Sequence, residues 1–307
     1  MKTILLGTDG SPASRNATEL AVALAKATES KLAIVSGWML PAPTLAFAPR
    51  LDIRVLEDAE RERAGRAVDA AAMVAERAGV DTAASVVADD PVDAICDEAE
   101  RRDAGLIVVG SRGWSTARKL LLGSVSLAVL GHAPRPVLVV RSDVPVALEE
   151  PKILLATDGS VPAHRAADLA IGLARETGWP LHAVSVWTIS PTPVTTASGI
   201  LPTLIELARA HAEDVLHDLA AEAEAAGVVL HHRVAGGPPA AAICEEATDL
   251  QATILVVGTR GWGAGKRFLF GSVSNRVVHE ASCPVLVAHS LNSARPSQHR
   301  EVAAAAR

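Results

Sequence analysis

The feature that most constrains the fold of this chain is an internal repeat. Residues 2–11 read KTILLGTDGS and residues 152–160 read KILLATDGS, so Asp9 and Asp158 lie at matched positions. A second motif also occurs twice, as GSRG at residues 110–113 and as GTRG at residues 258–261. Two copies of each motif, in the same order, predict two similar domains in tandem within the 307 residues.

Each half alternates short apolar runs with longer helical segments. Five strands are expected in each half, at residues 2–7, 31–38, 82–88, 106–109 and 136–140, and again at residues 152–156, 181–187, 229–235, 254–257 and 284–288; the fourth run of each half is typical of a fully buried strand. The first helix is expected to begin with Ser11 as its cap and Pro12 in its first turn. This β-α-β-α-β-α-β-α-β order predicts an α/β fold, in which each half is a doubly wound parallel sheet with helices on both faces.

A glycine-rich loop follows the fourth apolar run of each half. It reads Gly-x2-Gly-x9-Gly-Ser from Gly110 to Ser124, and the second copy keeps this spacing from Gly258 to Ser272. An apolar, helix-like run comes next, so each serine is expected to cap a helix whose first amides stay unpaired. Unpaired amides and the helix dipole attract anions, and glycines allow close approach of a ligand. The loop therefore predicts a phosphate site built mainly from main-chain groups.

Two better-known phosphate motifs are excluded. A P-loop requires glycine, four residues and then Gly-Lys-Ser/Thr, but Gly265-Lys266 has Arg260 at the upstream position and Arg267 after the lysine. No Gly-x-Gly-x-x-Gly follows the first apolar run of either half, so the dinucleotide-binding pattern is also missing.

The loop, placed directly after a strand, resembles the ATP-binding motif of the universal stress protein family in its tandem two-domain form. The resemblance extends over both halves, about nine-tenths of the chain. It implies a five-stranded parallel sheet of order 3-2-1-4-5 in each half, with strands 1 and 4 side by side. Ligands of such sheets bind at the carboxyl ends of the strands where the order reverses. Asp9 and Gly110 are therefore expected at one crevice, and Asp158 and Gly258 at another.

The resemblance also implies which residues contact ATP. In the first half these are Gly7, Asp9, Gly37, Gly110, Ser111, Arg112, Gly113, Gly123, Ser124, Val125 and Ser126. In the second half they are Ala156, Asp158, Val186, Gly258, Thr259, Arg260, Gly261, Gly271, Ser272, Val273 and Ser274. Gly37 and Val186 would read the adenine edge through main-chain groups, and the aspartates would accept hydrogen bonds from the base or the ribose.

Several of these residues have structural explanations as well. Asp9 and Asp158 can form Asx turns within Thr-Asp-Gly-Ser, the serines can cap helices, and the glycine of the first strand can serve strand packing. Arg112 and Arg260 can oppose phosphates or remain solvated loop charges. The residues alone leave these alternatives open.

The two halves differ before their third helix. The first half reads Ala88-Asp89-Asp90-Pro91, whereas the second reads Gly236-Gly237-Pro238-Pro239. Two carboxylates near a triphosphate would repel it or help to hold a divalent cation. We therefore expect ATP with Mg²⁺ as the ligand, and two sites that differ in affinity or in Mg²⁺ dependence. No protein-bound metal site is expected, because no cysteines or histidines have ligand spacing.

The residues favour binding over catalysis. Nothing near the loops resembles a nucleophile-base pair or a positioned acid and base. We therefore expect a regulator of the stress response whose signal is nucleotide occupancy. One alternative is a slow ATPase or nucleotide-dependent transferase in which Asp9 or Asp158 orients water or metal. Another is an interaction scaffold whose crevices are vestigial.

Composition limits the possible partners and the location of the protein. The formal net charge of −6 offers no attraction to nucleic acid or to an anionic membrane surface, and no apolar run reaches 18 residues. A cytoplasmic protein is expected, with its three cysteines as buried, reduced thiols. The resemblance implies that the fifth strands of the two halves pair within one chain, and that two chains form a homodimer.

Domain boundaries follow from the repeat and from the composition between its copies. We expect the first nucleotide-binding domain at residues 1–143, a linker at residues 144–150 and the second domain at residues 151–290. Residues 291–307 are polar and then alanine-rich, which is typical of a disordered tail.

Overall fold

The structure is a computed structural model that describes residues 2–40, 52–111, 122–141, 146, 148–189, 200–259 and 271–288. The strands of the first half are β1 (Thr3–Gly7), β2 (Lys31–Gly37), β3 (Thr82–Val87), β4 (Leu106–Gly110) and β5 (Val137–Val140). Its helices are α1 (Pro12–Ala27), α3 (Ile53–Arg77), α4 (Pro91–Arg101) and α5 (Ser124–His132).

The second half repeats this order of elements. Its strands are β6 (Ile153–Ala156), β7 (Leu181–Trp187), β8 (Leu230–Gly236), β9 (Ile254–Gly258) and β10 (Val285–Ala288). Its helices are α6 (Val161–Thr177), α8 (Leu201–Ala225), α9 (Pro239–Asp249) and α10 (Ser272–Glu280). The alternation of strands and helices predicted from the sequence is confirmed in both halves.

All ten strands form one sheet, in the order β3-β2-β1-β4-β5-β10-β9-β6-β7-β8. Within each half the strands are parallel and have the expected order 3-2-1-4-5. The halves join through β5 and β10, which pair in antiparallel orientation with Leu138 opposite Leu286. The expected pairing of the fifth strands within one chain is therefore present, and it covers two edges that would otherwise be exposed.

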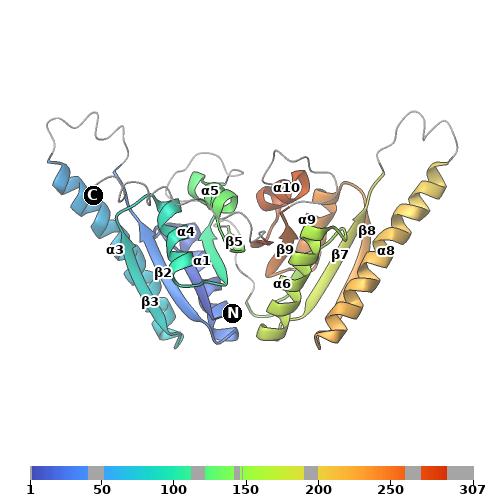
Figure 1. Cartoon of the computed structure of the whole chain (residues 1–307), viewed down its shortest axis with the longest axis horizontal. Helices are drawn as coiled ribbons and strands as arrows, with labels where there is room; N and C mark the ends of the chain where they lie inside the picture. The colour runs from blue at the N-terminus through green and yellow to red at the C-terminus, as the bar shows by residue number, and fades with distance from the viewer. Residues whose placement is uncertain are drawn as a thin grey trace, which may run out of the picture.

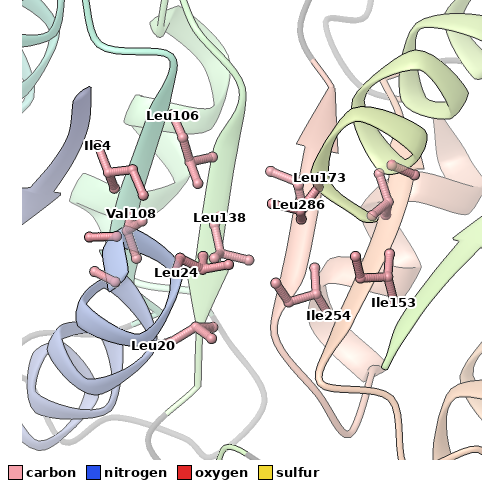
Figure 2. Packing of buried hydrophobic residues seen from close by; sticks show 14 of the residues in the cluster. Ile4, Leu20, Leu24, Leu106, Val108, Leu138, Ile153, Leu173, Ile254 and Leu286 are labelled. Atoms are coloured by element: carbon pink, nitrogen blue, oxygen red, sulfur yellow. The ribbon is translucent and has the colours of Figure 1, made fainter. Parts of the chain in front are cut away.

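Helices cover both faces of this sheet, as a doubly wound fold requires. Side chains of α1, α3, α6 and α8 pack on one face, and side chains of α4, α5, α9 and α10 pack on the other. Figure 1 shows α3 and α8 at the two outer ends, and α5 and α10 near the middle, one in each half. The apolar cluster under α1 and α6 continues across the junction through Leu138 and Leu286 (Figure 2).

The start of α1 follows from its sequence. Ser11 is the N-cap, and its hydroxyl accepts a hydrogen bond from the Ser14 amide at 3.3 Å. Pro12 lies in the first turn, where its missing amide has no helical partner to lose. Both expectations for this helix are confirmed. In the second half Ser160 is also the N-cap, but its side chain makes no capping hydrogen bond.

The cysteines are only partly as expected. All three are free thiols, but Cys283 is buried whereas Cys96 and Cys244 are half-buried. Burial raises the pKa of the Cys244 thiol to about 11 and that of Cys283 to about 12, so both stay protonated near neutral pH. Among the described residues, no helix is long and apolar enough to cross a membrane.

Candidate functional site

The two sequence motifs meet at the carboxyl edge of each half-sheet. Gly7 at the end of β1 pairs with Val109 of β4, so Asp9 and Gly110 follow neighbouring strand ends. In the second half Ala156 pairs with Val257 in the same way. From this point α1 leaves toward one face of the sheet, whereas α4 and α5 cover the other. This is the reversal of strand order at which open α/β sheets bind ligands.

The glycine-rich loop is closed at its base by hydrogen bonds. The Gly123 amide donates to the Ser111 carbonyl at 2.7 Å, and the Ser111 amide donates to the Val140 carbonyl at 2.6 Å. In the second half the Gly271 amide donates to the Thr259 carbonyl, also at 2.7 Å. The start of α5 or α10 is therefore held beside the end of β4 or β9.

The first turn of α5 and of α10 presents amides without helical partners. Gly123 is the N-cap of α5, with φ −65° and ψ 153°, and Gly271 adopts almost the same conformation before α10. Among the residues that the structure describes, no carbonyl accepts the amides of the next three residues in either helix. These residues are Ser124, Val125 and Ser126 in α5, and Ser272, Val273 and Ser274 in α10. Such a turn suits an anion.

The predicted capping role of Ser124 and Ser272 is wrong. Each serine is the first residue of its helix, and the preceding glycine is the N-cap without any side-chain hydrogen bond. The physical reason is that the extended cap conformation falls on the glycine, one residue earlier than a serine cap would require. Ser124 and Ser272 are exposed, so their hydroxyl groups are accessible together with their amides.

Ser126 and Ser274 have a structural role that is visible in the structure. The Ser126 hydroxyl donates to the Gly110 carbonyl at 2.6 Å, and the Ser274 hydroxyl donates to the Gly258 carbonyl at the same distance. Both side chains are buried. Each serine thus ties the helix to the strand end on the opposite side of the loop.

Close packing of helices accounts for three of the glycines. A Cβ on Gly110 would lie 2.7 Å from the Ala13 carbonyl carbon in α1, and one on Gly258 would lie 2.8 Å from the Pro162 oxygen. A Cβ on Gly37 would lie 2.8 Å from the Pro91 Cα, at the start of α4.

The position matching Gly37 in the second half carries Val186, which packs as a partly buried side chain on the apolar cluster beneath α9. The two halves therefore differ where β2 and β7 end.

The aspartates that follow β1 and β6 form the same turn in both halves. Asp9 Oδ1 accepts the Ser11 amide at 3.0 Å, and Asp158 Oδ1 accepts the Ser160 amide at 3.1 Å. The glycine between the two residues has a positive φ, 75° at Gly10 and 70° at Gly159. The Asx turn that the sequence offered as an alternative is therefore formed, and it holds each aspartate at the carboxyl edge of its half-sheet.

The acidic pair of the first half also makes local hydrogen bonds. Asp90 is the N-cap of α4 and accepts the Val92 amide at 2.8 Å, while Asp89 Oδ1 accepts the Asp90 amide at 2.8 Å. In the second half Gly237 has φ 124°, and Pro238 precedes α9 without a side-chain cap. Within the described part of the chain, no cluster of three or more histidines, cysteines and acidic residues is arranged to hold a metal.

Other predicted contacts lie outside the described residues. They are Arg112 and Gly113 of the first loop, and Arg260 and Gly261 of the second.

One aromatic residue at the carboxyl end of β2 was not among the predicted contacts. Trp38 directly follows β2, and the Arg61 guanidinium of α3 lies 5.4 Å from the centre of its ring. A tryptophan, Trp187, occupies the same position in the second half, and this repetition is the sequence signal that could have identified Trp38. Only the tertiary structure brings Arg61 to the ring of Trp38.

A buried carboxylate joins α4 to β3. Glu98 receives hydrogen bonds from the Ser85 hydroxyl at 3.0 Å, from Arg101 Nε at 2.7 Å and from Arg102. Burial opposes ionisation of Glu98, but the hydrogen bonds from the arginines and the serine outweigh burial and lower its pKa to about 2. The matched residue of α9, Glu246, has instead an ion pair with Arg233 of β8 at 2.9 Å.

Comparisons with known proteins agree with this architecture. The sequence model of the Universal stress protein family matches residues 1–141 and again residues 151–289. A universal stress protein of Methanocaldococcus jannaschii is 37% identical over 136 residues, which are 44% of this chain and 80% of that protein. One of Mycolicibacterium smegmatis is 36% identical over 188 residues, 61% of this chain and 62% of that protein.

A solved structure resembles the chain over nearly its whole length. The crystal structure of a universal stress protein from Archaeoglobus fulgidus matches with a TM-score of 0.68 and 27% identity. The match covers 93% of this chain and 97% of the other. Because the family model matches both halves in succession and the fold agrees, this chain belongs to the universal stress protein family, with two family domains in tandem.

Proposed function

We propose that this protein is a nucleotide-binding regulator in which ATP, with Mg²⁺, occupies both crevices and occupancy is the signal. The observation that carries the proposal is the first turn of α5 and of α10, whose amides have no acceptor among the residues that the structure describes and which lies beside a strand end where the sheet order reverses. The negative charge and the oxygens of a triphosphate suit such a turn, as those of other anions do, and the family to which the chain belongs makes ATP the ligand that we propose. The duplication of the arrangement supports two sites in each chain.

The remaining predicted contacts complete this proposal. The phosphates would lie against the amides of Ser124, Val125 and Ser126 in one crevice, and of Ser272, Val273 and Ser274 in the other. Arg112 and Arg260 would oppose the phosphates from the loops. Asp9 and Asp158 would accept hydrogen bonds from the adenine amino group or a ribose hydroxyl, from the turns that already orient them.

The decisive experiment removes one phosphate-binding amide at a time. Proline at position 124 or 272 deletes the first amide of α5 or α10. The extended conformation of the preceding glycine is the one that residues before proline favour. We expect isothermal titration of nucleotide-free protein to find about two ATP per chain. Ser124→Pro or Ser272→Pro should weaken one site by about tenfold to a hundredfold, since hydrogen bonds to charged groups contribute about 1.5–3 kcal/mol.

The matched controls are Ser124→Ala and Ser272→Ala, which remove the hydroxyl but keep the amide. They should bind ATP with nearly the affinity of the unsubstituted chain at both sites. Absence of binding in every form would reject the proposal, and an interaction scaffold with vestigial crevices would then be the better interpretation.

The single-site variants also test the expected difference between the crevices. Ser272→Pro leaves the first crevice, with Asp89 and Asp90 beside it, and Ser124→Pro leaves the second, with Gly236 and Gly237. ATP is titrated into each variant once with Mg²⁺ present and once with a chelator. The ATP affinity of the first crevice should differ more between the two conditions, because its carboxylates repel a triphosphate without a cation. Equal responses of the two variants would contradict this difference.

The alternative of slow hydrolysis has its own test. Purified protein is incubated with labelled ATP, and product is compared with the rate without protein and with Asp9→Ala and Asp158→Ala. We expect no product above the uncatalysed rate. Product that disappears in either variant would instead assign that aspartate to the orientation of water or metal.

Family membership supports the broader setting of the proposal. We place the protein in the stress response and in the cytoplasm, as a homodimer in which each chain contributes both crevices. Domains at residues 1–143 and 151–290, with a linker at residues 144–150, fit the family matches. Sedimentation analysis of the full chain tests the dimer, and a single species with the mass of one chain would contradict it.

A further inference from the structure

The first domain holds the second through an arginine at the point where its last strand ends. Arg141 directly follows β5, and its Nη1 donates a hydrogen bond to the His279 carbonyl at 2.6 Å. His279 belongs to the last turn of α10, whose carbonyls lack partners within the helix. A cation at this end is also favoured by the helix dipole. Arg141 therefore caps a helix of the other domain.

The helix that Arg141 caps is the one whose opposite end is proposed to bind phosphate. Helix α10 has nine residues and is therefore about 13 Å long. A short helix moves as one body, so a tilt at His279 displaces the amides of Ser272, Val273 and Ser274. The geometry of the second phosphate site thus depends on a side chain that the first domain supplies.

Arg141 is itself held by the first domain. Asn16 Nδ2 donates to the Arg141 carbonyl at 3.0 Å, and Asn16 lies in the second turn of α1. The first turn of α1 packs against Gly110, and its cap, Ser11, takes part in the turn of Asp9. A continuous series of contacts therefore runs from the first crevice through α1 and Arg141 to α10.

The second copy of the repeat does not carry the same two residues at the matched positions. The position matched to Asn16 is Arg165, and the position matched to Arg141 is His289, which lies outside the described residues. Neither substitute repeats the chemistry of its counterpart, since a guanidinium replaces an amide and a shorter imidazole replaces the guanidinium. The pair Asn16 and Arg141 belongs to the first copy alone.

We propose that Arg141 is a positioning residue for the second crevice, so that nucleotide affinity there depends on a contact made by the first domain. The inference rests on the proposed function, because it concerns the same phosphate site. It adds that the second domain binds with full affinity only when it is docked on the first.

The test uses the full chain with one crevice weakened at a time. In the Ser124→Pro background, Arg141→Met should lower the ATP affinity of the second crevice by about tenfold in isothermal titration, as expected for loss of a charge-assisted hydrogen bond. In the Ser272→Pro background, the first crevice should change by less than about twofold. Arg141→Lys keeps a cationic donor and should recover the second crevice to within about threefold of its affinity with Arg141.

A matched control separates positioning from net charge. Arg175 is exposed in the last turn of α6, and Arg175→Met removes the same charge without a contact to α10. It should leave both affinities unchanged. Equal weakening of both crevices by Arg141→Met, or an unchanged second crevice, would overturn the inference.

Hydrogen exchange gives a readout that does not need nucleotide. In Arg141→Met the amides of α10 should exchange faster, while those of α5 keep their rates. Unchanged exchange in α10 would overturn the positioning role even if ATP binds. If the unsubstituted chain binds no ATP, the proposed function fails, whereas the exchange result still decides whether Arg141 holds the helix.

Discussion

At the scale of single residues, Gly110 shows how the crevice is built. A Cβ at this position would lie 2.7 Å from main-chain atoms of both Ala13 and Ser14, and main-chain atoms cannot move aside as a side chain can. We therefore expect Gly110→Ala to lower the free energy of unfolding by about 1–3 kcal/mol, the usual cost of overpacking. Urea unfolding of nucleotide-free protein measures it, and Gly258→Ala should behave alike.

The control for this prediction is a glycine with open space around it. Gly172 lies inside α6, and a Cβ there would meet nothing within 4 Å. Gly172→Ala should raise the free energy of unfolding by about 0.5–1 kcal/mol, because alanine loses less conformational entropy in a helix. If Gly110→Ala proves as stable as the unsubstituted chain, helix packing does not explain this glycine and ligand approach becomes the better reason.

Glu98 gives the residue-scale prediction for pH. Its folded pKa of about 2 lies below the usual 4.5, so ionised Glu98 stabilises the fold fully above pH 4.5, and this contribution is lost as pH falls toward 2. Glu98→Gln should lower the free energy of unfolding by about 1–3 kcal/mol at pH 7, because two arginines lose their partner. The difference between the two proteins should shrink between pH 4.5 and pH 2 in urea unfolding.

The second half supplies the matched control for Glu98. Glu246 pairs with Arg233, whose side chain is 64% exposed, so Glu246→Gln should cost less than about 1 kcal/mol at pH 7. Equal costs for the two substitutions would mean that burial and the number of arginine partners do not distinguish these carboxylates.

At the scale of elements, the pairing of β5 with β10 joins the two halves. Leu138 and Leu286 lie opposite each other and both are fully buried. Leu138→Ala should lower the free energy of unfolding by about 2–5 kcal/mol, through lost apolar burial and the cavity that remains. Leu127→Ala is the control, since Leu127 of α5 is 50% exposed and its loss should cost at most about 0.5 kcal/mol.

A double variant tests whether the two leucines act as one unit. Because Leu138 and Leu286 are opposed in the ladder, the cost of replacing both should be smaller than the sum of the single costs. A strictly additive result would indicate that each leucine stabilises only its own domain. The antiparallel junction would then contribute little beyond its backbone hydrogen bonds.

At the scale of the whole molecule, ligand binding and stability are linked. A ligand at about 100 times its dissociation constant adds roughly 2.7 kcal/mol for each site that binds only the folded state. Thermal unfolding should therefore shift upward with ATP, less in Ser124→Pro or Ser272→Pro, and least in the double variant, in which both sites are weakened. Removal of ATP by dialysis should reverse the shift, and a shift of full size in the double variant would indicate a site elsewhere.

The sequence by itself determined the architecture, because the signals for it are local and repeated. Apolar runs, Pro12 after Ser11 and the repeated glycine spacing predict strands, a helix start and two anion-binding turns without knowledge of distant residues. The order 3-2-1-4-5 and the junction of the fifth strands came from family resemblance, and the structure has both.

Only the tertiary structure decided which partners individual side chains have. In the structure the N-cap of α5 is Gly123 and not Ser124, and the Ser126 hydroxyl donates a hydrogen bond to the Gly110 carbonyl. Arg141 donates one to a helix of the other domain. The two residues of the Ser126 contact are 16 positions apart in the chain, and those of the Arg141 contact are 138 positions apart. Both separations are beyond the reach of any helical or strand periodicity. Local patterns specify elements, whereas the partner of a polar side chain depends on which elements packing brings together.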